Sequence, residues 1–410
     1  MPGPGIRFVE LARVLAQVHD VTISAPTGSS SVTDAPRVVP YEPDRARALR
    51  DLFAKADVVV APPLPPALVG DAAQGGRAWI VDLHNPEPFE GLEEQRARPR
   101  IERKVRDVTR IDRIGFAVRR GTAFICGSER QRDMWLGFLA ASRRLDSDQY
   151  ESDPELRTLI DVVPFGIPAE PPRPSATPVA RGSLFPKDAR ILAWNGGIWD
   201  WLDPLTVLRA LAQLREDDPS WALVFNGAGR PSHRAAMGMA ARAMALADDL
   251  GLTASGAVAF RPGWTPYEER ASLCLEADIG VSAHSPTLEA RFAHRARMLD
   301  FVWARLPILC TEGDEWADHV VREGLGEVVP PGDVEAFAAA ARRIASRGRK
   351  AFEPALAAAA AGRTWDEAAR PLLQLVERIP SRRRRSRELA SLGFRLRYSA
   401  ANAARRAAGR

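Results

Sequence analysis

The sequence predicts an α/β fold built from two doubly wound domains, each a mostly parallel sheet with helices on both faces. Short β-branched runs alternate with amphipathic segments along most of the 410 residues, and this alternation is typical of parallel sheets. A proline-rich stretch interrupts the alternation once, at residues 164–178, and the pattern then restarts. Because small molecules bind at the carboxyl ends of strands in such folds, and often between lobes, we expect a site in the interdomain cleft.

Each predicted strand is a short apolar run followed by a turn-forming residue. In the first half, these runs lie at 21–24, 58–61, 79–83, 123–126 and 160–163, with helical periodicity between them. In the second half, they lie at 191–194, 222–225, 258–260, 279–282 and 307–310. Helices of the second half are expected near 204–214, 231–250, 266–276, 291–304 and 333–346.

The proline-rich stretch sets the domain boundaries. We expect an N-terminal domain over 1–168, a linker over 169–185, a C-terminal domain over 186–364, a closing helix over 365–380 and a basic tail over 381–410. A first strand should precede the Gly-Pro-Gly loop and the helix at 6–17, yet the chain begins at the loop. Strand one normally lies at the middle of such a sheet, so two explanations stay open: the true start lies upstream of Met1, or the fold lacks this strand and is compromised.

The composition is that of a globular protein, with 46% hydrophobic and 27% charged residues. The sequence contains no run of about 18 apolar residues, so it predicts no membrane-spanning helix. Its first residues lack the basic-then-apolar pattern of a signal peptide. The three cysteines show neither a disulfide framework nor metal-ligand spacing, and no two histidines have zinc spacing. These features predict a cytoplasmic protein without metal ligands.

The net charge of +5 originates in the C-terminal tail. Residues 380–410 hold ten arginines and one glutamate, so the rest of the chain is slightly negative, which argues against a nucleic-acid-binding core. The tail is either a basic amphipathic helix that contacts anionic lipid at the inner face of the membrane, or a solvated basic segment. Its few, irregularly spaced apolar residues favour the solvated segment.

Residues 288–308 predict an anion site. They follow a strand and a short loop, and their periodicity predicts one helix that leads into the next strand. Backbone N–H groups and the dipole at a helix N-terminus favour a diphosphate. Arg291, Arg295 and Arg297 lie in the first turns, where cations oppose the dipole unless an anion is bound. The alternative is a solvated basic face paired with Glu289 or Asp300.

A double glycine follows the strand at 191–194. Gly196 and Gly197 come directly after Asn195, and residues without a Cβ let the backbone approach a phosphate closely. A plain strand-to-helix turn is the alternative interpretation. The aromatic rings of Trp199 and Trp201 either stack on a base or sugar, or pack within the protein.

His84 follows the strand at 79–83, at the end of the sheet where α/β folds place functional side chains. An imidazole titrates near neutral pH, so His84 is a candidate acid, base or contact to a sugar. Asp82 is the competing candidate two residues earlier, and a structural role for a lone histidine is the alternative.

The order of several short motifs resembles one family. The helix before the strand at 307–310 ends in Ala304-Arg305-Leu306-Pro307, and family-4 glycosyltransferases of the GT-B fold carry two acids separated by seven residues on a helix with a similar ending. Asp300 matches the second acid, which that family associates with the donor ribose. Phe292 stands where the first acid would be, and Glu289 is the acid nearest to it on its N-terminal side.

Further segments are similar to an actinobacterial-type branch of that family. They lie at 3–13, 82–86, 127–137, 163–167, 195–204, 263–267 and 364–366. Each segment alone is weak, so the resemblance depends on their order over about 1–380. It implies the GT-B architecture: two doubly wound Rossmann-like domains that face each other across a cleft, followed by a C-terminal helical segment. The N-terminal domain would bind the acceptor and the C-terminal domain the donor.

The resemblance implies transfer of a sugar from a nucleotide-sugar donor to a sugar or lipid-linked acceptor, in cell-envelope polysaccharide or glycolipid synthesis. It implies retention of anomeric configuration, no metal and no cofactor, since the nucleotide-sugar is a substrate. Catalytic roles fall to His84, Asp82 and Glu289. Donor binding falls to Gly5, Arg7, Asn195, Gly196, Gly197, Arg291, Arg295, Arg297 and Asp300. A sugar-nucleotide epimerase and a non-catalytic nucleotide-sugar-binding protein are the alternative functions.

Overall fold

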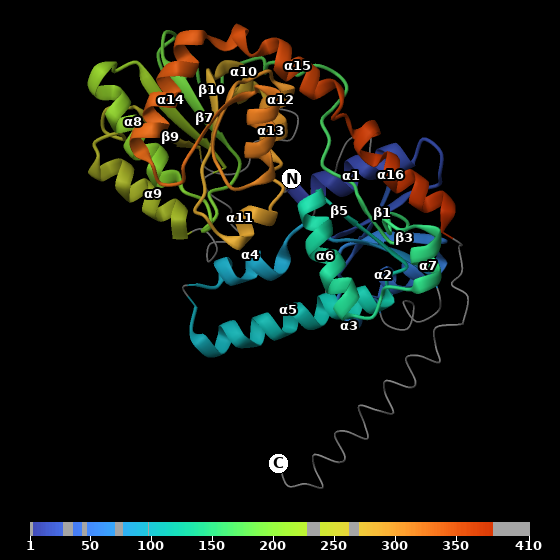
Figure 1. The fold of residues 1–410 in the computed structure, drawn as a ribbon. Helices are drawn as coiled ribbons and strands as arrows, with labels where there is room; N and C mark the ends of the chain where they lie inside the picture. Colours follow the sequence, from blue (N-terminus) through green and yellow to red (C-terminus); the bar gives the residue numbers. More distant parts are fainter. Residues whose placement is uncertain are drawn as a thin grey trace.

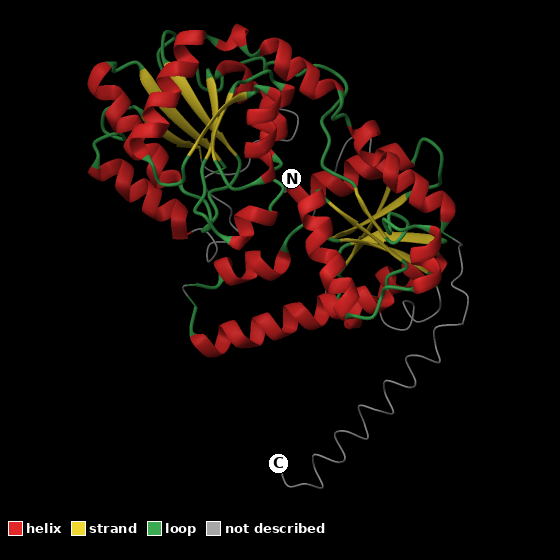
Figure 2. Ribbon diagram, viewed as in Figure 1, coloured by secondary structure: helices red, strands yellow, loops and turns green. Residues whose placement is uncertain are grey.

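The computed structural model has two α/β lobes, seen as two separate groups of strands enclosed by helices (Figures 1 and 2). The structure describes residues 3–27, 36–42, 47–69, 77–96, 98–227, 238–261 and 270–379. The motif at 263–267 and the basic tail at 381–410 therefore lie outside the described residues. No helix within the described ranges is long and apolar enough to cross a membrane.

The N-lobe alternates strands and helices from the first described residue. Its strands are β1 (Thr22–Pro26), β2 (Arg37–Tyr41), β3 (Val58–Ala61), β4 (Ala78–Asp82), β5 (Ala123–Cys126) and β6 (Ile160–Val162). Its helices are α1 (Gly3–Leu15), α2 (Arg47–Lys55), α3 (Pro66–Val69), α4 (Glu87–Glu94), α5 (Arg100–Arg120), α6 (Glu129–Ala141) and α7 (Ser147–Ser152). All strand pairs of this lobe are parallel.

The strands of the N-lobe form two sheets within the described residues. β1 pairs with β2, and a separate sheet has the order β3-β4-β5-β6. Both β4 and β5 are buried along their whole length, whereas every residue of β3 is partly exposed, as expected for a strand at a sheet edge. The first element described is helix α1, and its first turn contains the Gly-Pro-Gly sequence, which the sequence had placed in a loop.

The C-lobe contains one parallel sheet in the part of the chain that the structure describes, with the order β12-β11-β10-β7-β8-β9. Its strands are β7 (Arg190–Asn195), β8 (Trp221–Asn226), β9 (Val258–Arg261), β10 (Ile279–Ser282), β11 (Ile308–Thr311) and β12 (Gly326–Val329). Its helices are α8 (Pro204–Asp217), α9 (Gly238–Asp249), α10 (Arg270–Glu276), α11 (Leu288–Phe292), α12 (Arg297–Trp303), α13 (Glu315–Glu323) and α14 (Val334–Arg347). Strands β8, β10 and β11 are buried along their whole length and β7 is buried from Ile191 to Asn195, and these four strands form the centre of the core.

The helix expected over 291–304 is divided in the structure, which corrects the sequence prediction. α11 begins after Thr287, whose side chain accepts a hydrogen bond from the N–H of Ala290, and it ends at Phe292. At Ala293 the backbone is extended, and a second helix, α12, begins at Arg297. The break separates the arginines that the sequence placed in the first turns of one helix.

The segment between the lobes is fastened to the C-lobe. The carboxylate of Glu276, at the end of α10, accepts hydrogen bonds from the backbone N–H groups of Val179, Ala180 and Arg181. The chain returns to the N-lobe through α15 (Glu353–Ala361) and α16 (Trp365–Arg378). Ile167 and Thr364 form a parallel bridge, and α16 packs against α1 (Figure 1). Two passages of chain thus join the lobes.

Candidate functional site

The C-lobe sheet reverses its order between β7 and β10, which are neighbours although β8 and β9 lie between them in sequence. At such a switch point the connections leave the strands on opposite sides, and a crevice opens at the carboxyl ends. Asn195 ends β7, and the loop after β10 leads into α11. The predicted donor residue Asn195 therefore lies at this switch point.

A chain of hydrogen bonds joins the ends of β7 and β8 to α12. The Asn226 side-chain amide donates to Asn195 Oδ1 at 2.8 Å, and Asn195 Nδ2 donates to Asp300 Oδ2 at 2.9 Å. Arg270 Nε lies 3.1 Å from the other Asp300 oxygen. Burial raises the pKa of Asp300, although Arg270 and Arg297 oppose the shift. The structure thus brings Asn195 and Asp300 together, as expected of two residues of one site.

Arg297 lies against the double glycine. Its Nη2 donates to the carbonyl oxygen of Gly197 at 2.7 Å, and its guanidinium carbon is 4.9 Å from the Trp194 ring centre. Gly196 has a φ of +111°, and a Cβ at this position would come within 3.7 Å of the guanidinium. That distance is an ordinary van der Waals contact, so glycine is needed here for the backbone conformation.

The guanidinium of Arg297 is electrostatically unsatisfied. Burial, followed by the neighbouring charge of Arg295, lowers the pKa of Arg297 to about 9. Its Nη1 is buried and has no hydrogen-bond partner among the described residues. A buried cation without a full set of partners is costly, and a bound anion would supply them. Among the three predicted arginines, Arg297 has the geometry of a diphosphate ligand.

Arg295 is paired inside the protein, which corrects its predicted place in a phosphate cluster. Its two Nη atoms donate to the two carboxylate oxygens of Glu289 at 2.9 and 2.7 Å, and Asp314 Oδ2 lies 3.6 Å from its Nε. Burial alone would lower the pKa of Arg295, but Glu289 and Asp314 raise it. Glu289 is 1% exposed, and Arg295 binds both of its oxygens. The Glu289 carboxylate therefore holds α11 to the following chain and does not face solvent.

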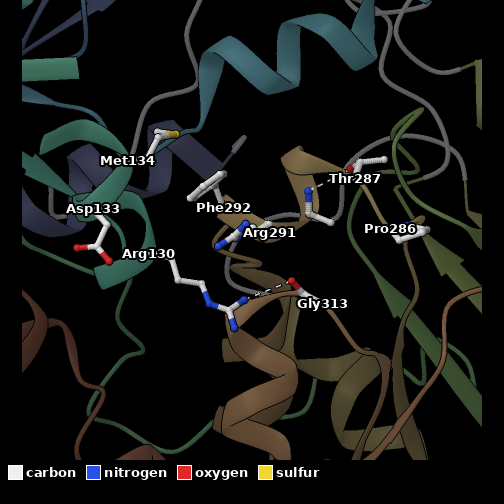
Figure 3. Close-up of a pocket in the computed structure, with 9 residues that line it drawn as sticks. Arg130, Asp133, Met134, Pro286, Thr287, Arg291, Phe292 and Gly313 are labelled. Atoms are coloured by element: carbon white, nitrogen blue, oxygen red, sulfur yellow. Dashed lines mark hydrogen bonds between the residues drawn. The ribbon is translucent and has the colours of Figure 1, made fainter. Parts of the chain in front are cut away.

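Arg291 lies in a different pocket, at the boundary between the lobes (Figure 3). This pocket has a volume of about 570 Å³, within the range of small-molecule sites. Met134 and Phe292 supply apolar surface, and Arg130 lies across the pocket from α11. Arg130 is held by the Gly313 carbonyl oxygen at 3.2 Å and by Asp318 at 2.5 Å. The prediction that Arg291, Arg295 and Arg297 form one phosphate cluster is therefore wrong.

The N-lobe side of the boundary is built around Asp82, at the end of β4. Arg7 of α1 donates to its two oxygens at 2.6 and 3.2 Å, and neither side chain is exposed. Burial alone would raise the pKa of Asp82, but Arg7 and His84 lower it far below its usual value. Arg7 also donates to the carbonyl oxygen of Pro164. Its guanidinium fastens α1 to the end of β4 and to the segment after β6, so its predicted donor contact has no support in this arrangement. Gly5 lies in the first turn of α1, in the N-lobe.

His84 follows Asp82 and lies at the surface where the lobes meet. Its Nδ1 is 3.3 Å from Asp82 Oδ2, and its ring packs edge-on against Phe165. Nε2 is buried and has no hydrogen-bond partner within the described ranges. The Phe165 ring stacks in turn on the His294 ring of the C-lobe, with ring centres 6.0 Å apart. His84 is thus oriented by Asp82 and faces the other lobe.

Sequence reasoning missed several residues of the site. Gln131 donates to the carbonyl oxygens of His84 and Phe292, at 2.8 and 2.9 Å, and so joins the lobes. Asn226 and Arg261 end β8 and β9, and Arg261 Nη1 is buried without a partner in the described structure. The position directly after a strand, which singled out Asn195, would have found both. Trp199 and Trp201 stack on each other, with ring centres 5.5 Å apart.

The structure is similar to solved glycosyltransferases, although no protein-family model and no curated protein matches the sequence. It aligns with Anabaena HepE, solved with UDP and glucose, at a TM-score of 0.67 and 13% identity over 92% of this chain and 96% of the other. Sucrose-phosphate synthase from Thermosynechococcus elongatus gives 0.62 and 16%, over 92% and 93%. WaaG, a glycosyltransferase of lipopolysaccharide biosynthesis, gives 0.58 and 17%, over 92% and 96%. The chain therefore has the GT-B fold, in which two Rossmann-like domains face each other.

Proposed function

We propose that this protein is a glycosyltransferase that moves a sugar from a nucleoside-diphosphate donor to an acceptor held between the lobes. Arg297 carries the proposal, because it is a partly buried cation, with one buried nitrogen that has no hydrogen-bond partner in the described structure, beside a double glycine at the switch point of a GT-B fold. Solved proteins of this fold include HepE, whose structures hold UDP or UDP-glucose. A diphosphate is the ligand that this cation and these backbone groups fit.

In the proposed complex, the diphosphate accepts the hydrogen bond for which Arg297 Nη1 has no partner in the described structure. Gly196 and Gly197 allow the backbone to approach the diphosphate. Asp300 and the Asn195 amide then hydrogen-bond the donor ribose. Negative charge develops on the leaving diphosphate during transfer, and a prearranged cation stabilises it without reorganisation. This arrangement would need no divalent metal ion and no cofactor, since the nucleotide-sugar is the substrate. Family resemblance favours retention of anomeric configuration.

We assign the N-lobe histidine to the reacting centre. Asp82 Oδ2 lies 3.3 Å from His84 Nδ1 and orients the ring by charge, which leaves Nε2 for a substrate group. Arg7 neutralises Asp82, so the Asp82 carboxylate acts by orienting His84 rather than as a base. Glu289 likewise acts by positioning rather than as a base, because Arg295 binds both of its oxygens and the pair positions α11. His84 is therefore the catalytic residue of the proposal, while Asp82 and Glu289 are positioning residues.

The pocket between α6 and α11 is the proposed approach of the acceptor. It combines the exposed Arg291 with the apolar surface of Met134 and Phe292, and it opens at the lobe boundary (Figure 3). A sugar or lipid-linked acceptor that carries a negative charge fits this lining. We place the reaction in the cytoplasm, in the synthesis of a cell-envelope polysaccharide or glycolipid.

Three functions can be separated with a panel of UDP-, GDP-, ADP- and dTDP-sugars. The purified protein is incubated with each donor, with and without lipid and oligosaccharide extracts, and nucleotides and sugars are quantified by mass spectrometry. A glycosyltransferase releases nucleoside diphosphate in an acceptor-dependent way. An altered sugar on an intact nucleotide identifies an epimerase, and binding without turnover identifies a non-catalytic protein. Either of these results would overturn the proposal.

Donor affinity distinguishes the three arginines. Arg297→Ala removes a charge-assisted hydrogen bond, worth about 1.5–3 kcal/mol, so the dissociation constant of the nucleoside diphosphate should rise roughly 10- to 100-fold. Arg291→Ala should change it less than about threefold, because Arg291 lies in the separate pocket. Arg209→Ala, an exposed arginine on α8, is the matched control. Isothermal titration with the nucleotide bound best in the panel measures all three. Equal losses for Arg291→Ala and Arg297→Ala would show that the diphosphate lies elsewhere.

A further inference from the structure

We propose that helix α5 docks this protein on an anionic lipid surface. The observation is a row of exposed apolar side chains on one helix. Ile101, Val105, Val108 and Ile111 have exposed fractions of 79, 61, 60 and 42%. At 3.6 residues per turn, positions spaced by three and four lie on the same face of a helix. A helix on a protein surface normally turns this face to the core and its polar face to water.

The buried side of α5 explains why the row is turned outward. Its buried residues, Ile114, Gly115, Ala117 and Val118, lie in the C-terminal half, which packs against β4. The N-terminal half extends past the N-lobe sheet alongside α4 (Figure 1). Arg110 and Arg113 bond to Glu94 and Glu87 of α4, so they hold the opposite face of α5 to the protein. The exposed row is therefore on the far side from the lobe.

The charge of α5 indicates which kind of partner its exposed apolar face binds. The 21 residues of α5 contain eight arginines and lysines and three acidic residues. Lys104 and Arg100 are exposed at the same end of the helix as Ile101, and Arg119 is exposed at the other end; Asp112 is the acidic residue exposed along the row. Apolar side chains interleaved with cations match a leaflet that contains anionic lipid, because the apolar groups enter the acyl boundary and the cations meet the headgroups.

A second copy of the chain fits this face less well. A symmetric contact through α5 would place two basic helices against each other, and the repulsion between like charges would oppose it. An anionic bilayer has the opposite sign. The helix is about 30 Å long, so it can lie along the membrane plane with its whole apolar row in contact. This surface is independent of the proposed donor site and of any catalytic activity.

The test uses the full-length protein and large unilamellar vesicles made either of phosphatidylcholine alone or of phosphatidylcholine with phosphatidylglycerol. Binding is measured by co-flotation at several salt concentrations. We expect binding to the anionic vesicles that weakens with added salt, and at least tenfold weaker binding to phosphatidylcholine. The variant I101D/V105D should bind anionic vesicles at least tenfold more weakly than the wild type.

The matched control is V18D/V321D. It places the same two charges at valines that are 64 and 70% exposed elsewhere on the protein, and its vesicle binding should stay within about threefold of the wild type. Circular dichroism confirms that each variant is folded. Absence of vesicle binding by the wild type would overturn the proposal. So would undiminished binding by I101D/V105D, which would assign the membrane contact to the basic tail, or a dimer in solution that I101D/V105D abolishes.

Discussion

At the scale of single residues, the N-lobe depends on one buried ion pair. Arg7 and Asp82 are both fully buried, and their hydrogen bonds join α1 to the end of β4. Removing one member of such a pair leaves an uncompensated charge in a medium that solvates it poorly. The pair also orients His84, so its loss would affect stability and the proposed chemistry together.

Arg7→Met should therefore destabilise the protein by about 3–5 kcal/mol at pH 7, because the Asp82 carboxylate remains buried without its cation. Arg370→Met is the control. Arg370 pairs with Glu367, their side chains are 62 and 44% exposed, and exposed ion pairs contribute at most about 1 kcal/mol. Urea unfolding measures both variants. Comparable losses in the free energy of unfolding would show that the buried ion pair of Arg7 contributes no more to stability than an exposed one.

The acid dependence of this pair has a definite sign. The pKa of Asp82 is lower in the folded protein than in the unfolded chain. Its contribution to stability is therefore complete above the unfolded value of about 3.9 and is lost as the pH falls towards the folded value. In Arg7→Met the cause of the low pKa is removed, so the fall in stability with acid should be smaller than in the wild type.

The residues of the site differ in how far the sequence could predict them. Asn195, Gly196, Gly197 and Asp300 were found because a position after a strand and a spacing within a helix are local properties. Arg295 could not be separated from Arg297, because the partners that bind it, Glu289 and Asp314, are assigned by tertiary packing. The path of the backbone over residues 293–296 decides which arginine faces Gly196 and Gly197. No local sequence pattern predicts that path.

At the scale of elements, the predicted strands coincide with observed strands, and two short strands were missed. β2 (Arg37–Tyr41) contains Pro40, and β12 (Gly326–Val329) contains Glu327 and has a single buried residue. Both lie at a sheet edge within the described residues. An edge strand is covered on fewer sides than a central one, so its apolar run is short and its sequence signal weak.

The packing of α12 on the sheet predicts the effect of a substitution at Gly280. A Cβ on Gly280 of β10 would lie 2.6–2.7 Å from three ring carbons of Phe301, so α12 rests directly on the backbone of the strand. Gly280→Ala should cost about 1–3 kcal/mol and displace Arg297 and Asp300, which α12 carries. Donor affinity should fall along with the free energy of unfolding.

Gly362→Ala is the matched control for this substitution. A Cβ there meets nothing within 4 Å, and its φ of −90° suits any residue. It should change stability by less than about 1 kcal/mol, and a small gain is the expected direction. Urea unfolding and nucleotide titration are carried out on both variants. A Gly280→Ala protein that unfolds later or binds donor as tightly as wild type would show that Phe301 can move aside.

At the scale of the whole molecule, the lobes meet through a mixture of apolar and charged contacts. Phe89 of α4 stacks on Phe292 of α11 with ring centres 5.4 Å apart, at the position where the family resemblance expects an acid. Gln131 bridges the lobes by hydrogen bonds, and Arg130 pairs with Asp318. These contacts join the two lobes directly, and we call this arrangement closed.

We expect one carboxyl group to make the contact between the lobes depend on pH. Glu90 of α4 lies at the meeting surface of α4 and α11, where burial, then Glu289 and Glu87, raises its pKa to about 8; Arg295 and Arg110 oppose the shift. Separated lobes would return Glu90 to water and to its ordinary pKa near 4.5. Between these two values the closed form binds one proton more than the open form. Closure is therefore most stable below about pH 4.5 and weakens as the pH rises towards 8.

Glu90→Gln mimics the protonated side chain, so the variant should stay closed where the wild type opens. Small-angle scattering from pH 5 to 9 measures the radius of gyration, which should grow with pH in the wild type and remain constant in Glu90→Gln. Glu94→Gln is the control, since Glu94 lies on the same helix with a side chain 33% exposed and should keep the wild-type response. A wild-type radius independent of pH, or a Glu90→Gln protein that opens like the wild type, would show that the proton on Glu90 does not govern closure.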